Sequence, residues 1–302
     1  MTLVNTKQML NKAIKDKFAI CAFNIYNLES AIAAVESAKT TNKPIILAVS
    51  ESGAEYAGFE NLVAICSSLA KINNVKIALH LDHGKSYEVC KKAIDSGFTS
   101  VMIDGSSLSF EENIKLTKKV VKYAHTHDCT VEAELGKILG TEDFVTSNTL
   151  TFTDPAEAKT FVEQTNVDSL AISIGTAHGI NKSVSEPKIN FECIKEIRKL
   201  LPTTPLVAHG SSSVPKEFVQ TINNNGGSIK KSQGIPNDTL KQMVACGINK
   251  VNMDTDIRLA FTSAIRKDFN ENPSNFDPRK YLGKGKALAK EYMIKMINLI
   301  TK

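Results

Sequence analysis

The sequence contains no tryptophan, and its other aromatic residues, Phe and Tyr, make up only 6% of the 302 residues. Long hydrophobic runs are missing too, because no apolar stretch approaches the roughly 20 residues that a membrane helix needs. The first segment, Met1 to Phe18, lacks the apolar block and the cleavage site of a signal peptide. We therefore expect a protein of the cytoplasm with no membrane partner.

Cysteine pairs at metal-binding or redox spacing are also absent. The six cysteines lie far apart and form no CxxC pair, so they indicate small reduced core residues. The net charge of +5 is not gathered into a basic stripe, and no nucleic-acid motif is present. DNA and RNA are therefore not expected partners, whereas a local positive site for a phosphorylated metabolite stays open.

A regular alternation of strand and helix patterns fills the chain. After an opening helix, eight short apolar segments read as strands, at residues 18–24, 44–50, 75–83, 99–104, 130–135, 169–174, 205–209 and 249–253. A helical pattern follows each of them sooner or later. Eight strands in this alternation predict an α/β fold, a single-domain (β/α)8 TIM barrel over residues 1–302 with a short N-terminal helix and a C-terminal helical extension.

A doubly wound open sheet is the competing architecture. It would normally show a glycine fingerprint after the first strand, but residues 24–27 read Asn-Ile-Tyr-Asn. Residues 136–154 form the longest stretch that we expect to be irregular between a strand and its helix. Long loops of this kind in enzymes are often lids.

The third predicted strand ends in His80-Leu81-Asp82-His83-Gly84. Adjacent strand residues point to opposite sides, but where the strand gives way to its loop Asp82 and His83 can both reach one pocket. One of them could bind a metal while the other moves protons. The alternative is that Asp82 caps the next helix beside a core histidine, and His80 inside the strand favours packing over ligation.

Polar residues also end most of the other predicted strands, and active sites of barrel enzymes lie at that face. His83, His178 and His209 fall at the ends of three separate strands. Three imidazoles at one barrel mouth indicate a catalytic zinc, because three protein ligands leave a coordination position for substrate. Singly, each histidine would be read as a hydrogen-bonded structural residue.

Phosphate sites in barrels often follow strands seven and eight. Residues 210–213, Gly-Ser-Ser-Ser, and residues 252–256, Asn-Met-Asp-Thr-Asp, occupy those places and offer backbone N–H groups and hydroxyls. Lys182, four residues beyond His178, adds a positive charge. A plain turn and a solvated lysine are the alternatives.

Taken together, the motifs make the sequence resemble the class II, metal-dependent fructose-1,6-bisphosphate aldolases, of the shorter subgroup that also contains tagatose-bisphosphate aldolases. The resemblance covers essentially the whole chain through LHLDHG at 79–84, VEAELG at 131–136, IGTAHG at 174–179, VAHGSS at 207–212 and KVNMDTDIR at 250–258. It implies that His83, His178 and His209 hold Zn²⁺, and that zinc stabilises the enediolate in place of a lysine Schiff base.

The same resemblance assigns the proton transfers. Asp82 would exchange the proton of the substrate's C4 hydroxyl, and Glu142 in the long loop would protonate C3 in cleavage and deprotonate it in condensation. Asp104 and Glu134 match positions of a second or alternative divalent metal, although they could instead orient the histidines. A monovalent cation requirement stays open.

Substrate contacts are implied for the sugar phosphate. The dihydroxyacetone-phosphate end would lie against Gly179, Lys182, Gly210, Ser211, Ser212, Asn252, Met253, Asp254 and Thr255, and Ser50 would meet the other phosphate. Arg258 and Arg279 would reach that phosphate from a neighbouring subunit, so we expect a homodimer or homotetramer.

Asp254 favours fructose bisphosphate, because the tagatose enzymes tend to carry alanine there. The two sugars differ only at C4, where the wrong epimer leaves a buried polar group unpaired. Tagatose-1,6-bisphosphate aldolase is the nearest alternative. A zinc hydrolase would usually take an HxH pair from the first strand, which residues 23–25 lack, and a non-catalytic barrel binding protein would not need Asp82, Glu142 and three histidines.

Overall fold

A computed structural model describes residues 3–142, 145–147, 151–178, 187–230 and 233–301. Its described part contains a closed barrel of eight parallel strands in the order β1-β11-β10-β8-β5-β4-β3-β2. The strands are β1 (Ile20–Asn24), β2 (Ile45–Ser50), β3 (Ile77–Gly84), β4 (Ser100–Ile103), β5 (Thr130–Leu135), β8 (Ser169–Ile172), β10 (Leu206–Ala208) and β11 (Ile248–Met253). The predicted (β/α)8 barrel is confirmed.

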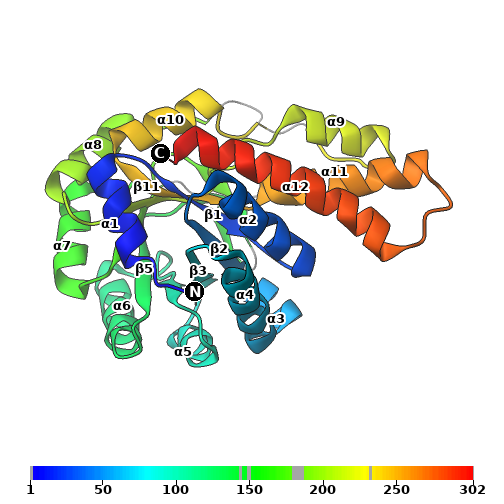
Figure 1. The fold of residues 1–302 in the computed structure, drawn as a ribbon. Coiled ribbons are helices and arrows are strands. Elements are labelled where there is room, and N and C mark those ends of the chain that lie inside the picture. The colour runs from blue at the N-terminus through cyan, green and yellow to red at the C-terminus, as the bar shows by residue number, and fades with distance from the viewer. Residues whose placement is uncertain (1–2, 143–144, 148–150, 179–186, 231–232, 302) are drawn as a thin grey trace.

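Helices surround the barrel and carry the chain back to the start of each next strand (Figure 1). They are α2 (Leu28–Thr41), α3 (Glu51–Ala57), α4 (Phe59–Asn73), α5 (Tyr87–Ser96), α6 (Phe110–His125), α7 (Pro155–Thr165), α8 (Phe191–Leu200), α9 (Lys216–Asn224), α10 (Asn237–Cys246), α11 (Thr255–Glu271) and α12 (Pro278–Ile300). Side-chain caps mark several starts, since Ser86 accepts from Val89 N–H and Ser109 forms a capping box with Glu112. These helix starts therefore have a local cause in the sequence.

Two parts of the sequence prediction differ from the structure. The stretch 136–154 is not wholly irregular, because β6 (Leu139–Glu142) and β7 (Val145–Ser147) pair antiparallel, and β9 (Ala177–His178) pairs with β6. Only two residues separate β6 from β7, and the paired segments contain the β-branched residues Thr141, Val145 and Thr146, as is typical of a hairpin. The helical pattern that follows the second strand is divided into two helices, α3 and α4, which Gly58, at φ 87°, separates.

The barrel interior changes character along its axis. Near the amino end it is apolar, where Met9 and Leu10 of α1 (Lys7–Asp16) pack against Ile20, Ile46 and Ala78. Toward the carboxyl end the inward positions become polar, as the step from Ala78 to His80 to Asp82 along β3 illustrates. The polar interior positions therefore lie toward the carboxyl end of the barrel.

The six cysteines fit the expected role of reduced core residues. All are free thiols, and all but the partly buried Cys246 are buried. None of the described helices is long and apolar enough to cross a membrane.

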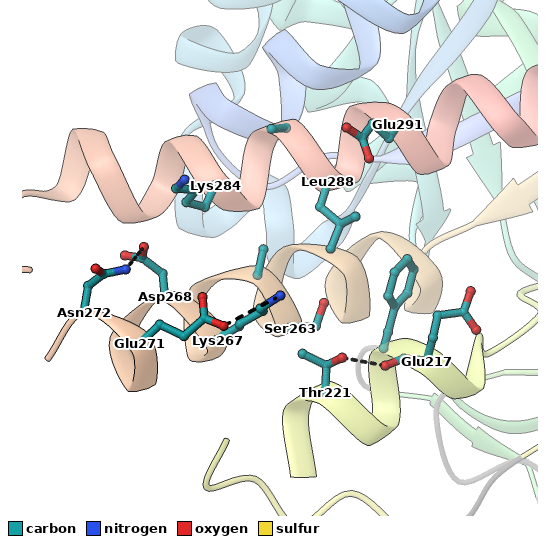
Figure 2. A pocket seen from close by; sticks show the side chains of 13 residues that line it. Glu217, Thr221, Ser263, Lys267, Asp268, Glu271, Asn272, Lys284, Leu288 and Glu291 are labelled. Carbon is teal, nitrogen blue, oxygen red and sulfur yellow. Dashed lines mark hydrogen bonds and ion pairs between the residues drawn. The ribbon is translucent and has the colours of Figure 1, made fainter. Parts of the chain in front are cut away.

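The helices α11 and α12 form a hairpin that extends past the barrel, with α9 beside it (Figure 1). A groove of about 440 Å³ lies between these three helices (Figure 2). Its charged side chains are of both signs and partly paired along their own helix, as in the ion pair of Lys267 with Glu271. The groove therefore has no charge of one sign that would select a ligand.

Candidate active site

The end of β3 brings Asp82 and His83 to the same side. His83 has a left-handed backbone, with φ 50°, and the pairing of β3 with β4 shifts its register between Leu81 and Gly84. A regular strand would point adjacent side chains to opposite faces, so this local turn explains why both reach the barrel mouth. Ligand atoms of Asp82, His83 and His209 lie within 4.8 Å of one another.

Two imidazoles face each other at this mouth. His83 Nε2 and His209 Nδ1 lie 3.0 Å apart. The other ring nitrogen of each contacts a buried carboxylate: His83 Nδ1 lies 3.1 Å from Asp104 Oδ2, and His209 Nε2 lies 2.8 Å from Glu132 Oε1. A nitrogen that donates to a carboxylate carries the ring proton, which leaves the facing nitrogen of a neutral imidazole with a lone pair.

Two lone pairs at this distance repel each other unless a cation lies between them. Two nitrogen ligands of a tetrahedral zinc, each about 2.0–2.1 Å from the metal, would be separated by about 3.3 Å. Burial lowers the pKa of His209, although the hydrogen bond to Glu132 acts in the opposite direction. The lowered pKa keeps the ring neutral, as a metal ligand must be. The donor set present therefore fits a divalent metal.

A second group of ligand atoms shares His83. Oxygens of Asp104 and Glu134 lie within 4.8 Å of a His83 nitrogen and of each other. Asp104 also accepts from Lys85 Nζ at 3.3 Å and from Ser106 Oγ at 2.6 Å. Burial alone would raise the pKa of Asp104, but the hydrogen bond of His83 and the charge of Lys85 lower it well below its usual range. Asp104 is thus an ionised acceptor for His83.

Asp82 is held between two amides. Asn24 Nδ2 donates to Asp82 Oδ2 and Asn252 Nδ2 donates to Asp82 Oδ1, each at 2.9 Å. The carboxylate is fully buried, and its Oδ1 lies 4.0 Å from His209 Nδ1. The side-chain carbonyl oxygens of Asn24 and Asn252 are buried and accept no hydrogen bond from the described residues, so they can accept from substrate hydroxyls.

The loop after β10 is fixed to the C-terminal helices. Asp256 accepts from Ser213 N–H and Val214 N–H at 2.8 Å each, and Tyr292 O–H donates to it at 2.6 Å. Gly210, at φ 60°, lies so close to β9 that an added Cβ would be 2.6 Å from the backbone of Ala177. Only glycine fits there, and the contact brings the backbone of β9, which ends at His178, beside His209.

Comparison with known proteins identifies the family. The family described as "Fructose-bisphosphate aldolase class-II" matches residues 4–302. The chain belongs to this class II aldolase family. It is 44% identical over 291 residues to a fructose-bisphosphate aldolase of Thermus caldophilus, covering 96% of this chain and 95% of that protein.

Other class II aldolase relatives and structures agree. A fructose-bisphosphate aldolase of Helicobacter pylori is 40% identical over 301 residues, covering 99% of this chain and 98% of the relative. The crystal structure of the YdjI aldolase from Escherichia coli K12 superposes with a TM-score of 0.81 at 29% identity, over 99% of this chain and 97% of that one. Class II membership implies a divalent metal, in accord with the donor set at the barrel mouth.

The structure brings many of the residues predicted for a class II aldolase to the barrel mouth. His83, His209, Asp82, Asp104, Glu134 and Asn252 lie there, and Gly210, Ser211 and Ser212 follow His209 directly. Strands β6 and β9 carry Glu142 and His178 and pair through Gly140 and His178, but the side chains of Glu142 and His178 lie outside the described part of the structure. Gly179 and Lys182 lie outside the described residues altogether.

Other predicted class II aldolase contacts have partners within the chain. Ser50 Oγ caps α3 by accepting from Gly53 N–H at 3.3 Å. Asp254 pairs with Arg258 at 2.9 Å, and Thr255 begins α11. The side chain of Met253 lies in the hydrophobic core between barrel and helices, so only its backbone is available at the mouth. Arg279 is at the start of α12, 89% exposed and paired with Asp277.

Three buried residues of the site were not predicted. Asn24 orients Asp82, Glu132 accepts from His209, and Lys250 Nζ donates to Glu132 at 2.7 Å. A signal for Glu132 and Lys250 exists in the sequence, since each places a charge in the middle of an apolar strand. Asn24 offers a weaker signal, a polar residue that ends the first strand.

Proposed function

We propose that this class II aldolase reversibly cleaves fructose 1,6-bisphosphate to dihydroxyacetone phosphate and glyceraldehyde 3-phosphate, with zinc as its metal. The observation that carries the proposal is the buried Asp82 carboxylate, fixed by two amides beside the facing nitrogens of His83 and His209. A general base and a metal-ligand pair within 4.8 Å are what an aldol cleavage between C3 and C4 requires.

The metal would be held by His83, His209 and His178. When bound, it supplies Lewis-acid stabilisation of the negative charge that develops on the ketone half of the substrate. Lys250, buried inside the barrel, is unsuited to the alternative Schiff-base chemistry. Its Nζ is 2.7 Å from Glu132 Oε2 and 3.2 Å from His80 Nε2, so it acts as a paired cation and offers no free lone pair.

The chain's own residues account for the proton transfers. In cleavage, Asp82 takes the proton of the C4 hydroxyl, the C4 carbonyl forms, and the C3–C4 bond breaks with its electron pair left on C3. Glu142 then gives a proton to C3, which completes dihydroxyacetone phosphate. The amides of Asn24 and Asn252 keep both carboxylate oxygens of Asp82 in place, so the base needs no reorientation during the reaction.

Binding of the two phosphates is divided between loops. The stretch Gly210 to Ser212, with Gly179, Lys182 and residues 252–255, would hold the dihydroxyacetone-phosphate end, and Ser50 would meet the other phosphate. Asp254 would select fructose over its C4 epimer. Arg258, which contacts Asp254 and Tyr26 within its own chain, would reach the second phosphate in the site of a neighbouring subunit.

The direct test is cleavage of fructose 1,6-bisphosphate by purified protein before and after chelator treatment, with tagatose 1,6-bisphosphate run in parallel. We expect activity to be lost on chelation, to return with zinc, and to favour the fructose substrate. Activity that survives complete metal removal would contradict the metal mechanism. A preference for tagatose bisphosphate would assign the chain to the sister activity.

We also propose that the enzyme is a homodimer or a tetramer built from dimers. The support is the projecting α11–α12 hairpin, whose tip carries Phe276, 91% exposed, next to the exposed Arg279. Light scattering should give two or four chain masses. Arg279→Ala should raise KM for fructose 1,6-bisphosphate about tenfold, as expected for a lost charged hydrogen bond to phosphate. A monomer with full activity would contradict this proposal.

A further inference from the structure

A chain of buried polar side chains runs through the barrel interior below the metal-binding mouth. His209 Nε2 lies 2.8 Å from Glu132 Oε1, and Glu132 Oε2 accepts from Lys250 Nζ at 2.7 Å. Lys250 Nζ lies 3.2 Å from His80 Nε2, whose Nδ1 lies 2.8 Å from Ser100 Oγ. All five side chains are buried, and they come from β3, β4, β5, β11 and the residue that follows β10.

The two charged members of this chain depend on each other. Lys250 and Glu132 have almost no exposed surface, and a buried charge without its partner is strongly destabilising. Lys250 Nζ, 2.7 Å from Glu132 Oε2, compensates the negative charge of Glu132, and His209 Nε2 lies 2.8 Å from its other oxygen. Glu132 is thus an ionised acceptor, and His209 donates its Nε2 proton to it.

The same hydrogen bond decides which nitrogen of His209 is available for a metal. With the proton on Nε2, the lone pair is on Nδ1, the atom that faces His83 Nε2 at 3.0 Å. His80 lies next in the same chain of hydrogen bonds. Its Nδ1–H donates to Ser100, so its Nε2 is the acceptor for Lys250. Every proton along the chain thereby has one assigned position.

We propose that the buried Lys250–Glu132 ion pair is a positioning unit of the metal centre: Lys250 holds Glu132 as an acceptor, and Glu132 fixes the ring orientation and tautomer of His209. This inference rests on the proposed function, in which His209 is a metal ligand. Lys250 and Glu132 touch neither substrate nor metal. Their effect therefore appears first in metal affinity.

The test compares zinc affinity, measured by competition with a chromophoric chelator. The variants remove the buried charges of Lys250 and Glu132 and the oxygen that accepts from His209 separately. Lys250→Met leaves Glu132 as an uncompensated buried acid, and we expect zinc affinity to fall about 10- to 100-fold, as for other lost partners of metal-binding histidines. The double variant Lys250→Met with Glu132→Gln removes both charges but keeps an oxygen that accepts from His209. It should recover most of the affinity.

Two controls separate positioning from general damage. Lys250→Met with Glu132→Leu is also neutral but has no acceptor, so its zinc affinity should stay low while its metal-free melting temperature matches that of the Gln double variant. Lys85→Met removes the partly exposed lysine beside Asp104, and its effect should be smaller because solvent screens that site.

The outcomes decide the proposal even if Lys250→Met fails to fold. Equal zinc affinity of the Gln and Leu double variants would overturn it, as would a folded Lys250→Met that binds zinc like the wild type. A failure of the proposed metal-dependent function would give a different result: the wild-type protein itself would then keep its activity after chelation.

Discussion

At the scale of single residues, the proposed chemistry depends most on the side chain of Asp82. Two amides at 2.9 Å hold its two oxygens, and no part of it is exposed to solvent. A carboxylate that is fixed in this way can receive a proton in only one direction. Its replacement by an amide of the same shape should therefore remove the base at the cost of turning over one neighbouring amide, so that Asn24 or Asn252 accepts from the new NH2 group.

We expect Asp82→Asn to lower kcat by about 10²- to 10⁴-fold, the usual contribution of general acid–base catalysis. Zinc content, measured by atomic absorption, should stay near that of the wild type because the proposed histidine ligands are unchanged. Steady-state cleavage of fructose 1,6-bisphosphate is the measurement. A kcat within threefold of wild type would show that another group takes the C4 proton.

Some residues of the site could be predicted from the sequence and others could not, for a physical reason. Asp82, His83 and His209 each end a strand, and strand ends of a parallel barrel meet at one mouth, so their proximity follows from topology. Lys250 and Glu132 are inside strands, where inward or outward direction depends on the register. The left-handed backbone of His83 likewise depends on contacts with β4 that no local pattern encodes.

At the scale of elements, α12 does more than close the ring of helices. Tyr292, on this helix, donates to Asp256 at 2.6 Å and lies 2.9 Å from Ser213 Oγ, so the helix is tied to the loop that follows His209. Burial and the charge of Asp256 raise the pKa of Tyr292 well above its usual value, which keeps the hydroxyl a neutral donor. Val214, next in the loop, has a left-handed backbone with φ 49°.

Loss of this hydroxyl should loosen the loop. We expect Tyr292→Phe to raise KM for fructose 1,6-bisphosphate about fivefold, equivalent to about 1 kcal/mol for one hydrogen bond, with kcat changed much less. Tyr281→Phe on the same helix is the matched control, since Tyr281 packs against Phe269 at the far end of α12. Equal effects of the two variants would mean that the hydroxyl of Tyr292 has no bearing on substrate binding.

The elements themselves were easier to predict than the loops between them. Strand β5 has the predicted bounds, and α5 begins directly after its cap residue Ser86, because the local signals agree in both segments. The hairpin of β6 and β7 escaped prediction because it is short, rich in polar residues and partly stabilised by β9, which is more than thirty residues away in the sequence. Pairing at that separation is a property of the tertiary fold.

At the scale of the whole molecule, the buried polar chain makes stability depend on pH. Burial, reinforced by the charge of Lys250, lowers the pKa of His80 to about 3. In the unfolded chain a histidine titrates at about 6.5, so as the pH falls the unfolded state binds the proton first. This contribution to stability is complete above pH of about 6.5 and is lost progressively as the pH falls toward 3.

We expect the free energy of unfolding of the wild type to fall by about 1.4 kcal/mol more than that of His80→Gln between about pH 7.5 and about pH 5.5. The glutamine keeps an acceptor toward Lys250 but has no titrating group. Urea unfolding of the metal-free proteins at both pH values gives the comparison, in which Glu132 and Asp104 contribute equally to both proteins. Parallel losses would show that folding does not shift the pKa of His80.

In the described part of the structure, the apolar floor of the barrel, where α1 packs over Ile20, Ile46 and Ala78, blocks the amino end, so the proposed metal ligands are reached from the carboxyl-end mouth. An ion that binds between His83 and His209 has to come and go by the route that the sugar phosphate uses. The order of binding then matters, because the metal must bind before the substrate and a bound substrate blocks the release of the metal. Chelators should consequently strip the resting enzyme quickly and the substrate-filled enzyme slowly.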